Sequence, residues 1–295
     1  MDIFKRLRPA WWAHRMDLLL RRFFCLIFGL YGLLGCGSAS AQFSKLDELT
    51  AQVAKKLKAQ KPHLIGVSEF TTVDGFPSNQ GDYFAWFVST SLVYHGKQLP
   101  IAERDLFKAL LAKEGIAPKD LSSTDALKRV AASTHIDTLI TGTVETGPAN
   151  YTIRVIAWRL PEASPLIDKT TVIKRTGFTD SLSETFPPKT DYPLVRVKKL
   201  NGVIDKTYIP RCIYCPNPDY NDAARRSKIQ GTSMFEVLIS PAGDVMKAHP
   251  TKLLGYGLDE QAYEAIKRWR LKPVTQADGT PVAVLVEVEV TFHLY

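Results

Sequence analysis

The chain has 295 residues, of which 45% are hydrophobic and 23% charged, a balance that suits folded domains and excludes a wholly disordered chain. The formal net charge is +8, but residues 1–35 contribute +4 of it, so the remaining residues carry only +4. Their lysines and arginines are scattered and form no basic stripe interleaved with aromatic residues, which argues against nucleic-acid binding.

Residues 1–41 have the order of an export signal. Arg21 and Arg22 precede the apolar run 23–34, and small residues follow as far as Ala41. Three outcomes stay open: lipidation of Cys36 at the end of a lipobox-like run, ordinary cleavage after Ala41, or retention of the apolar run as a membrane anchor. All three predict a protein in the cell envelope that faces the periplasm.

The region 42–165 alternates predicted strands with predicted helices. Helices are predicted at 44–60, 83–93, 106–111 and 126–133, and strands at 63–71, 99–104, 137–145 and 151–160, with a turn at 147–150. This alternation predicts an α/β domain. The sequence contains no GxxxxGK[ST], GxGxxG or GxSxG motif, so we expect a binding or scaffolding domain without an enzymatic site or a cofactor.

The same region carries a resemblance. The segments LIGVSEF, STSLV, LPIAERDLFKALL, HIDTLITGTV and YTIRVIAWRL, in this order, are similar to the FlgO and CsgG group of secretion-associated lipoproteins and to the N-terminal domain of TolB. Glu103, Arg104 and the DTLITGTV strand carry most of this likeness. Serine, threonine and proline residues then predict an extension and linker over 166–210.

The C-terminal region 211–295 predicts a small α+β domain. A short helix is followed by strands at 231–240 and 244–248, which a turn at 241–243 joins, and by a helix whose apolar stripe runs from Leu258 to Trp269. From Ala283 to Tyr295 valine, phenylalanine and leucine alternate with glutamate, threonine and histidine. A period of two with β-branched residues predicts a terminal strand with one face on a core.

Five segments of this region, DYNDAARRSKIQG, SPAGDV, GLDEQAYEAIKRWRLKPV, DGTPV and VEVTFHLY, resemble the C-terminal domain of TonB-family energy transducers. The resemblance implies a small antiparallel sheet with two helices. It also implies that an edge of this sheet takes up the short N-terminal box of a TonB-dependent outer-membrane transporter. The residues to which that role carries over are Ala283, Val284, Leu285, Val286, Glu287, Val288, Glu289, Val290 and Thr291.

In this family the energy comes from a proton-driven motor of the ExbB and ExbD type, so such a motor is a further expected partner. Two features depart from the family pattern: the apolar run 23–34 contains no histidine, and a long Pro-Glu or Pro-Lys tract is missing.

The terminal strand itself allows two interpretations. An exposed edge offers unpaired N–H and C=O groups to an extended peptide. The charges of Glu287 and Glu289 would instead protect that edge against pairing with another strand. If the amide of Val286 faces the edge, a proline there would remove a ladder donor and abolish peptide capture.

Cys212 and Cys215 form a C-x-x-C motif followed by Pro216. An oxidising compartment favours a structural disulfide, while a redox site or half of a metal site remain alternatives. The remaining histidines show no paired spacing, so no metal site is expected. Trp269 is expected to be a core residue, with a partner hot spot as the alternative.

Together these patterns predict a TonB-like periplasmic protein, not an enzyme, that binds transporter peptides by strand addition and transduces energy for transmembrane transport. The alternative is an envelope adaptor lipoprotein that uses the same domain for assembly or cargo binding without energy coupling. A thiol oxidoreductase is a third class, and it would require a reactive thiol at Cys212 or Cys215.

Overall fold

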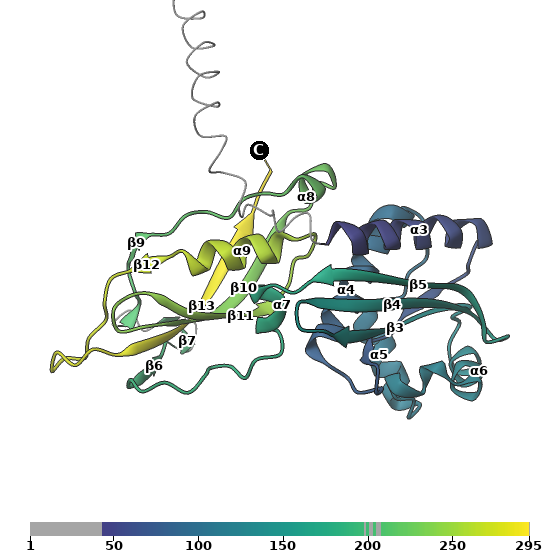
Figure 1. Cartoon of the computed structure of the whole chain (residues 1–295), viewed down its shortest axis with the longest axis horizontal. Helices are drawn as coiled ribbons and strands as arrows, with labels where there is room; N and C mark the ends of the chain where they lie inside the picture. Colours follow the sequence, from purple (N-terminus) through teal and green to yellow (C-terminus); the bar gives the residue numbers. More distant parts are fainter. Residues whose placement is uncertain (1–42, 198, 201–202, 205–207, 295) are drawn as a thin grey trace, which may run out of the picture. The chain divides into compact units, whose positions relative to one another are not determined.

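The computed structural model describes residues 43–197, 199–200, 203–204 and 208–294 (Figure 1). Within these ranges no helix combines the length and the apolar character that crossing a bilayer requires. The predicted targeting segment, including Cys36 and the apolar run 23–34, lies outside the described residues.

The first sheet has the strand order β1-β3-β4-β5, with β2 also paired to β3. The strands are β1 (Ile65–Val67), β2 (Thr71–Thr72), β3 (Thr138–Thr146), β4 (Asn150–Arg159) and β5 (Ser164–Lys174). β1 and β2 run parallel to β3, whereas β4 and β5 continue the sheet as antiparallel neighbours. The parallel pairs need a long connection between β2 and β3, and helices supply it.

Helices cover this sheet on both faces. They are α3 (Ser44–Gln60), α4 (Asn79–Gly96), α5 (Arg104–Lys113), the 3₁₀ helix η1 (Pro118–Ser122) and α6 (Thr124–Ser133). Because side chains alternate along β3, Ile140 joins the core under α3 and α4, while Leu139 joins the separate core of α5, η1 and α6. The region is therefore α/β in architecture.

The predicted helices of this region are confirmed, and helix 44–60 has the predicted bounds. The strand predicted at 99–104 is wrong: Ile101 makes a single parallel bridge to Ile65. The chain turns into α5 at Arg104 because the Glu103 carboxylate accepts hydrogen bonds from the amides of Asp105 (3.1 Å) and Leu106 (2.7 Å) and caps the helix. The sheet also extends into the predicted linker, since β5 reaches Lys174.

The second sheet has the strand order β11-β10-β13-β6. Its strands are β6 (Leu194–Arg196), β10 (Gly231–Ile239), β11 (Val245–Lys252) and β13 (Ala283–Phe292). The predicted turn at 241–243 joins β10 to β11, and Gly243 has a φ of +91° there, where a Cβ would overlap the carbonyl of Leu271. The sheet is mixed and not purely antiparallel as expected, because β6 joins it parallel to β13.

Shorter elements complete this region: α7 (Gly177–Ser181), β7 (Lys199–Leu200), β8 (Val203–Ile204), β9 (Cys212–Tyr214), α8 (Asp222–Arg226), α9 (Leu258–Lys267) and β12 (Arg270–Leu271). α9 buries Ala262 and Ile266 on the same core as Phe235 of β10 and Phe292 of β13. An α/β region followed by an α+β region agrees with the predicted fold class.

Buried residues of the two sheets belong to one continuous core. The ring of Phe178 in α7 packs edge-on against Tyr83 of α4 at 5.4 Å and against Tyr263 of α9 at 5.8 Å. The Tyr83 hydroxyl donates a buried hydrogen bond of 2.7 Å to Oε1 of Glu260 on α9. The Tyr83 hydroxyl of the first region thus has its buried hydrogen-bond partner in the second region.

Candidate functional site

One edge of β13 is fully paired inside the sheet. β10 runs antiparallel to it from Gly231, opposite Phe292, to Ile239, opposite Val284, without a register shift. This unbroken register gives every second residue of β13 a pair of main-chain hydrogen bonds to β10.

The other edge of β13 is paired only at its beginning. β6 covers Ala283, Val284 and Leu285 in parallel register. The Ala283 amide donates to the Pro193 carbonyl, and the Val197 amide donates to the Leu285 carbonyl, both at 2.9 Å. From Val286 to Phe292 no strand among the described residues pairs with this edge. The predicted peptide-binding residues 283–291 thus fall into two groups. The first three already have a neighbouring strand on each side, and among the described residues the others have one on a single side.

The hydrogen-bonding pattern shows which residues offer free groups. Since Ala283 and Leu285 direct their main-chain groups toward β6, alternation along the strand turns the same groups of Glu287, Glu289 and Thr291 toward the open edge. The amide of Val286 faces β10 instead. The condition under which a proline at Val286 would act on the open edge is therefore not met, and Glu287 and Glu289 are the positions at which a proline would act there.

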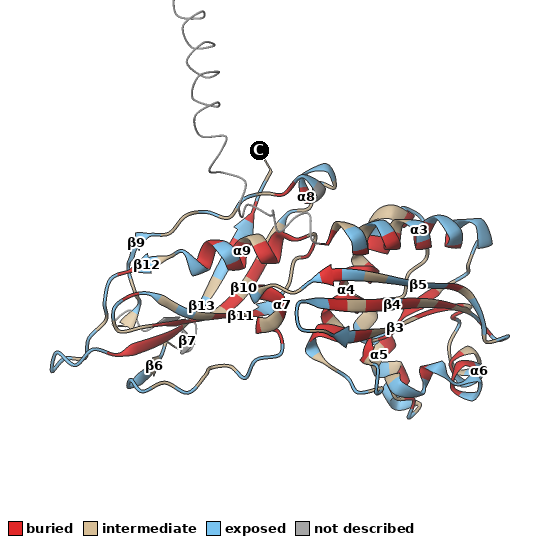
Figure 2. Ribbon diagram, in the orientation of Figure 1, coloured by how far each residue is buried: buried red, intermediate tan, exposed pale blue. Residues whose placement is uncertain are grey.

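The side chains of β13 confirm the predicted two-faced pattern. Val284, Val290 and Phe292 are buried on the face covered by α9, whereas Glu287, Glu289 and Thr291 are exposed on the opposite face. The exposed side chains stand on a face of the sheet and leave its edge uncovered. Figure 2 shows β13 buried at its start and alternating in burial farther along the strand.

A group of charges crosses the sheet beside this edge. Glu287 lies directly opposite Glu236 of β10, a like-charge pair that costs stability. Arg196 of β6 forms an ion pair with Glu236 and so compensates one of the two carboxylates. In the part of the chain that the structure describes, no cation forms an ion pair with Glu287 or Glu289.

Two buried carboxyl groups hold α9 under the sheet. Asp259 accepts hydrogen bonds from the Leu254 amide (2.8 Å), the Gly255 amide (2.7 Å) and the Ser233 hydroxyl (2.6 Å). Burial raises the pKa of Asp259, and these hydrogen bonds oppose that rise. Asp259 thereby fixes the loop between β11 and α9 to Ser233, near the start of β10.

The neighbouring Glu260 is less well satisfied. Its Oε1 accepts from Tyr83, but Oε2 is buried and has no hydrogen-bond partner in the described region. Burial, with the adjacent Asp259 as a second cause, raises the pKa of Glu260 to about 8. Near neutral pH the side chain therefore holds a proton. Sequence reasoning missed both carboxyl groups, because their burial depends on Tyr83 and Ser233, which lie far away in the sequence.

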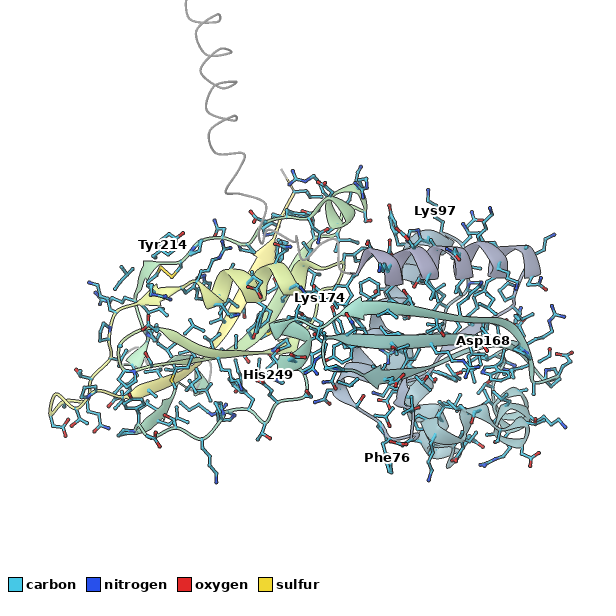
Figure 3. The ribbon with its side chains drawn as sticks, viewed as in Figure 1. Phe76, Lys97, Asp168, Lys174, Tyr214 and His249 are labelled. Carbon is cyan, nitrogen blue, oxygen red and sulfur yellow. A yellow bond between two sulfur atoms is a disulfide. The ribbon has the colours of Figure 1, made fainter. Side chains whose placement is uncertain are left out.

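Cys212 and Cys215 are joined by a disulfide, drawn in yellow beside Tyr214 in Figure 3. The bridge closes the short strand β9, which pairs with β12 directly after α9. No group of histidine, cysteine, aspartate or glutamate side chains within the described ranges has the arrangement of a metal site. Among the described residues the C-x-x-C motif lies on and just after β9 and not at the N-terminus of a helix, where a redox C-x-x-C usually lies.

Trp269 follows the end of α9 and is partly buried against the core. Its indole N–H donates a hydrogen bond of 3.2 Å to the Pro216 carbonyl, one residue beyond the disulfide. Its packing agrees with the expected core role. The hydrogen bond also links the end of α9 to the segment after the disulfide, a contact that the helical spacing did not predict. Arg270 is exposed and pairs with Asp244 at 3.0 Å.

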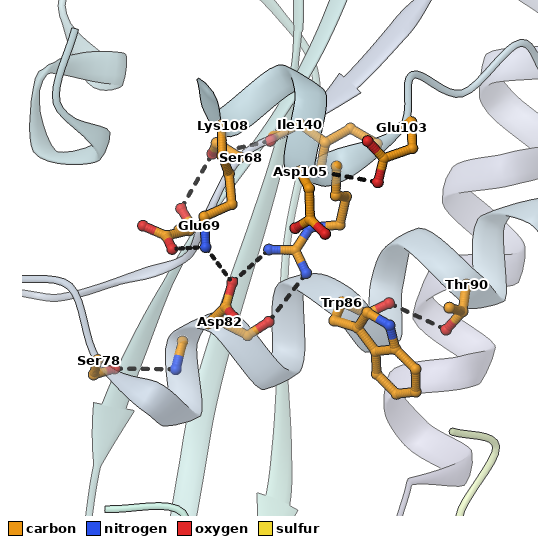
Figure 4. Close-up of polar contacts among 12 residues, drawn as sticks. Ser68, Glu69, Ser78, Asp82, Trp86, Thr90, Glu103, Asp105, Lys108 and Ile140 are labelled. Atoms are coloured by element: carbon orange, nitrogen blue, oxygen red, sulfur yellow. Dashed lines mark hydrogen bonds and ion pairs between the residues drawn. The ribbon is translucent and has the colours of Figure 1, made fainter. Parts of the chain in front are cut away.

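A second polar cluster lies between α4 and α5 (Figure 4). Arg104 pairs with Asp82 at 2.6 Å, and Lys108 contacts both Asp82 and Glu69. Two cations and two carboxylates thus neutralise one another beside a cavity of about 460 Å³ that Leu111 and Ile116 help to line. The cluster holds α5 against α4, and its charges are engaged with one another.

The C-terminal unit is an α+β domain in which, among the described residues, β13 leaves a regular edge of its sheet open. Residues 216–294 match the family model of the Gram-negative bacterial TonB protein C-terminal domain, and this part of the chain is a TonB C-terminal domain. Protein TonB of Vibrio cholerae is 36% identical over 78 residues. That match covers 26% of this chain and 32% of the relative, so the chain spans about a third of the length of the curated relative.

The matches to solved structures are weak. The C-terminal domain of LpoB from Salmonella enterica is 8% identical, with a TM-score of 0.35, over 45% of this chain and 98% of that one. Lipoprotein GNA1162 from Neisseria meningitidis is 13% identical, with a TM-score of 0.28, over 38% of this chain and 78% of that one. Both similarities are too low to indicate a shared function. The likeness of region 42–165 to the FlgO, CsgG and TolB group stays a prediction.

Proposed function

We propose that this chain is a periplasm-facing envelope protein whose C-terminal domain binds an extended segment of a TonB-dependent outer-membrane transporter by strand addition. The observation that carries the proposal is the open edge of β13 from Val286 to Phe292, within a domain that matches the TonB C-terminal family. An added strand would satisfy the outward-facing N–H and C=O groups of Glu287, Glu289 and Thr291.

Energy transduction is the finer part of the proposal. The transporter segment held at β13 would receive force through the rest of the chain, and a motor of the ExbB and ExbD type would supply it. The Cys36 or apolar-run anchor would hold the other end at a membrane. The TonB match over residues 216–294 supports this role.

The alternative function is an envelope adaptor lipoprotein without energy coupling. One observation favours it: the C-terminal domain is joined by buried contacts to a folded α/β region, such as the hydrogen bond from Tyr83 to Glu260. A tether that transmits force over a distance does not need such contacts. Mass spectrometry of the mature N-terminus separates the two functions, since a lipidated Cys36 favours the adaptor and an intact apolar run favours transduction.

The strand-addition step is tested with two variants at one position. Glu289→Pro removes one outward-facing amide N–H, which an edge strand tolerates in the fold. Glu289→Ala removes the charge but keeps the amide. We expect transporter N-terminal peptides, measured by calorimetry with the full chain, to bind Glu289→Pro at least tenfold more weakly than Glu289→Ala. Equal affinity for both folded variants would contradict strand addition at this edge.

A further inference from the structure

β6 is a strand of the linker region that occupies the start of the open edge. Its ladder to β13 runs from the Pro193 carbonyl to the Val197 amide. Leu194 is 39% exposed, Arg196 is exposed and Val195 is only half-buried. β6 is therefore held mainly by main-chain hydrogen bonds and by the ion pair between Arg196 and Glu236, and it buries little apolar surface.

The part of the edge that remains open continues the same ladder. β6 ends at Arg196, and Glu287 is the next residue of β13 that directs its main-chain groups outward. A ligand strand that uses only the open part meets three outward-facing residues. A ligand that also replaces β6 meets Ala283 and Leu285 as well, and its ladder becomes correspondingly longer.

The side chains of β6 show which chemistry this edge accepts. Val195 pairs in register with Val284, whose side chain is buried on the face covered by α9. Arg196 stands on the opposite face and reaches Glu236, the carboxylate directly opposite Glu287. Since opposite charges on neighbouring strands attract, a ligand continuing in parallel would find Glu287 and Glu289 on the same face as further partners for basic residues.

We propose that β6 competes inside this chain for the edge of β13: the partner strand replaces residues 193–197 and shares their alternation of a β-branched apolar residue with a basic one. This inference rests on the proposed function for the identity of the partner, and it adds the competing strand and the side-chain pattern.

The test uses the full chain and a fluorescent peptide with the sequence of residues 191–198. In the parallel register the Val195 amide faces β13, so Val195→Pro empties this part of the edge. Leu194→Pro is the matched control, because that amide points away from β13. We expect the peptide to bind Val195→Pro at least tenfold more tightly than it binds the unaltered chain or Leu194→Pro. Arg196→Ala, which leaves the backbone unchanged, should give a gain of about threefold.

The charge pattern is tested with a second peptide in which glutamate replaces the arginine that corresponds to Arg196. We expect it to bind Val195→Pro at least fivefold more weakly than the first peptide. Equal binding of the first peptide by all four chains, or its failure to bind a folded Val195→Pro chain, would overturn the inference.

Transporter N-terminal peptides distinguish this inference from the proposed function. If they bind the unaltered chain and Val195→Pro equally, the proposed function stands and competition by β6 is refuted. If the peptide of residues 191–198 binds Val195→Pro while transporter peptides bind none of the four chains, strand recognition stands and the transporter is refuted as the partner.

Discussion

β5 and β13 are both long strands at an edge of their sheets, but they are protected in different ways. β5 begins beside Pro165, has a register shift against β4 and carries Lys169 and Lys174. Proline, lysine and irregular register are the features by which natural edge strands avoid pairing with other chains. Between Val286 and Phe292 β13 has none of the three: the charged residues there are Glu287 and Glu289, and the register with β10 is regular.

The third edge strand supports the same distinction. β11 contains Pro250, Lys247 and Lys252 and has two register shifts against β10. Two edges of the molecule are thus unsuited to strand addition, whereas β13 is suited to it wherever β6 does not cover it. This difference is what favours β13 over the other edge strands in the proposed strand addition.

The largest expected effect separates the two edges of β13 itself. Val286→Pro removes an amide hydrogen bond to β10 inside the sheet and should lower the free energy of unfolding by roughly 2–4 kcal/mol. Glu287→Pro removes an outward-facing amide and should leave stability nearly unchanged while it abolishes peptide binding. Urea denaturation and peptide titration of both variants measure this. Equal destabilisation by both would show that the outward edge of β13 is not free.

The second prediction concerns the shared core on which both sheets depend. The folded protein keeps a proton on Glu260 up to about pH 8, whereas the unfolded chain loses it near pH 4.5. The contribution of Glu260 to the free energy of unfolding should therefore be largest below pH 4.5, fall between pH 4.5 and about 8, and level off above that. Glu260→Gln should remove on the order of 3 kcal/mol of this fall.

The control for this pH dependence is Glu264→Gln, an exposed position on the same helix. Urea denaturation at a series of pH values should give that variant the same slope as the unaltered chain. Glu260→Gln should give a flatter curve, and parallel curves for all three chains would contradict a buried protonated carboxyl group at α9.

Much of this architecture follows from local sequence patterns, and the rest does not. The helical stripe from Leu46 to Leu57 and the alternation along β13 are set by burial on one face, and both were correctly predicted. β6 was missed because three residues in a proline-containing linker give too short a pattern, although Leu194-Val195-Arg196-Val197 does alternate. The division of the β13 edge could not be predicted without β6, since it depends on pairing between distant segments.

The disulfide should stabilise the first residues of the C-terminal domain without contributing to peptide binding at the β13 edge. Replacing Cys212 and Cys215 by serine opens a four-residue loop, and the loop-entropy estimate gives a loss of about 2 kcal/mol. Thermal unfolding should reveal this loss, while peptide affinity at β13 should stay unchanged. A loss of function in a folded double variant would instead favour the thiol oxidoreductase.

The smallest expected effect comes from making β5 resemble β13. Pro165→Thr combined with Lys169→Thr removes two of its protective features. Analytical ultracentrifugation at high protein concentration should detect weak self-association in this variant and none in the unaltered chain. A strictly monomeric variant would contradict the assignment of a protective role to Pro165 and Lys169, because only the register shift and Lys174 would remain.

Amide hydrogen exchange along β13, measured residue by residue by NMR, tests the central claim most directly. The amides of Val286, Val288 and Val290 should exchange slowly, whereas those of Glu287, Glu289 and Thr291 should exchange fast and become protected when a transporter peptide is added. Slow exchange of all six amides in the free protein would show that the edge is already occupied and would contradict the account.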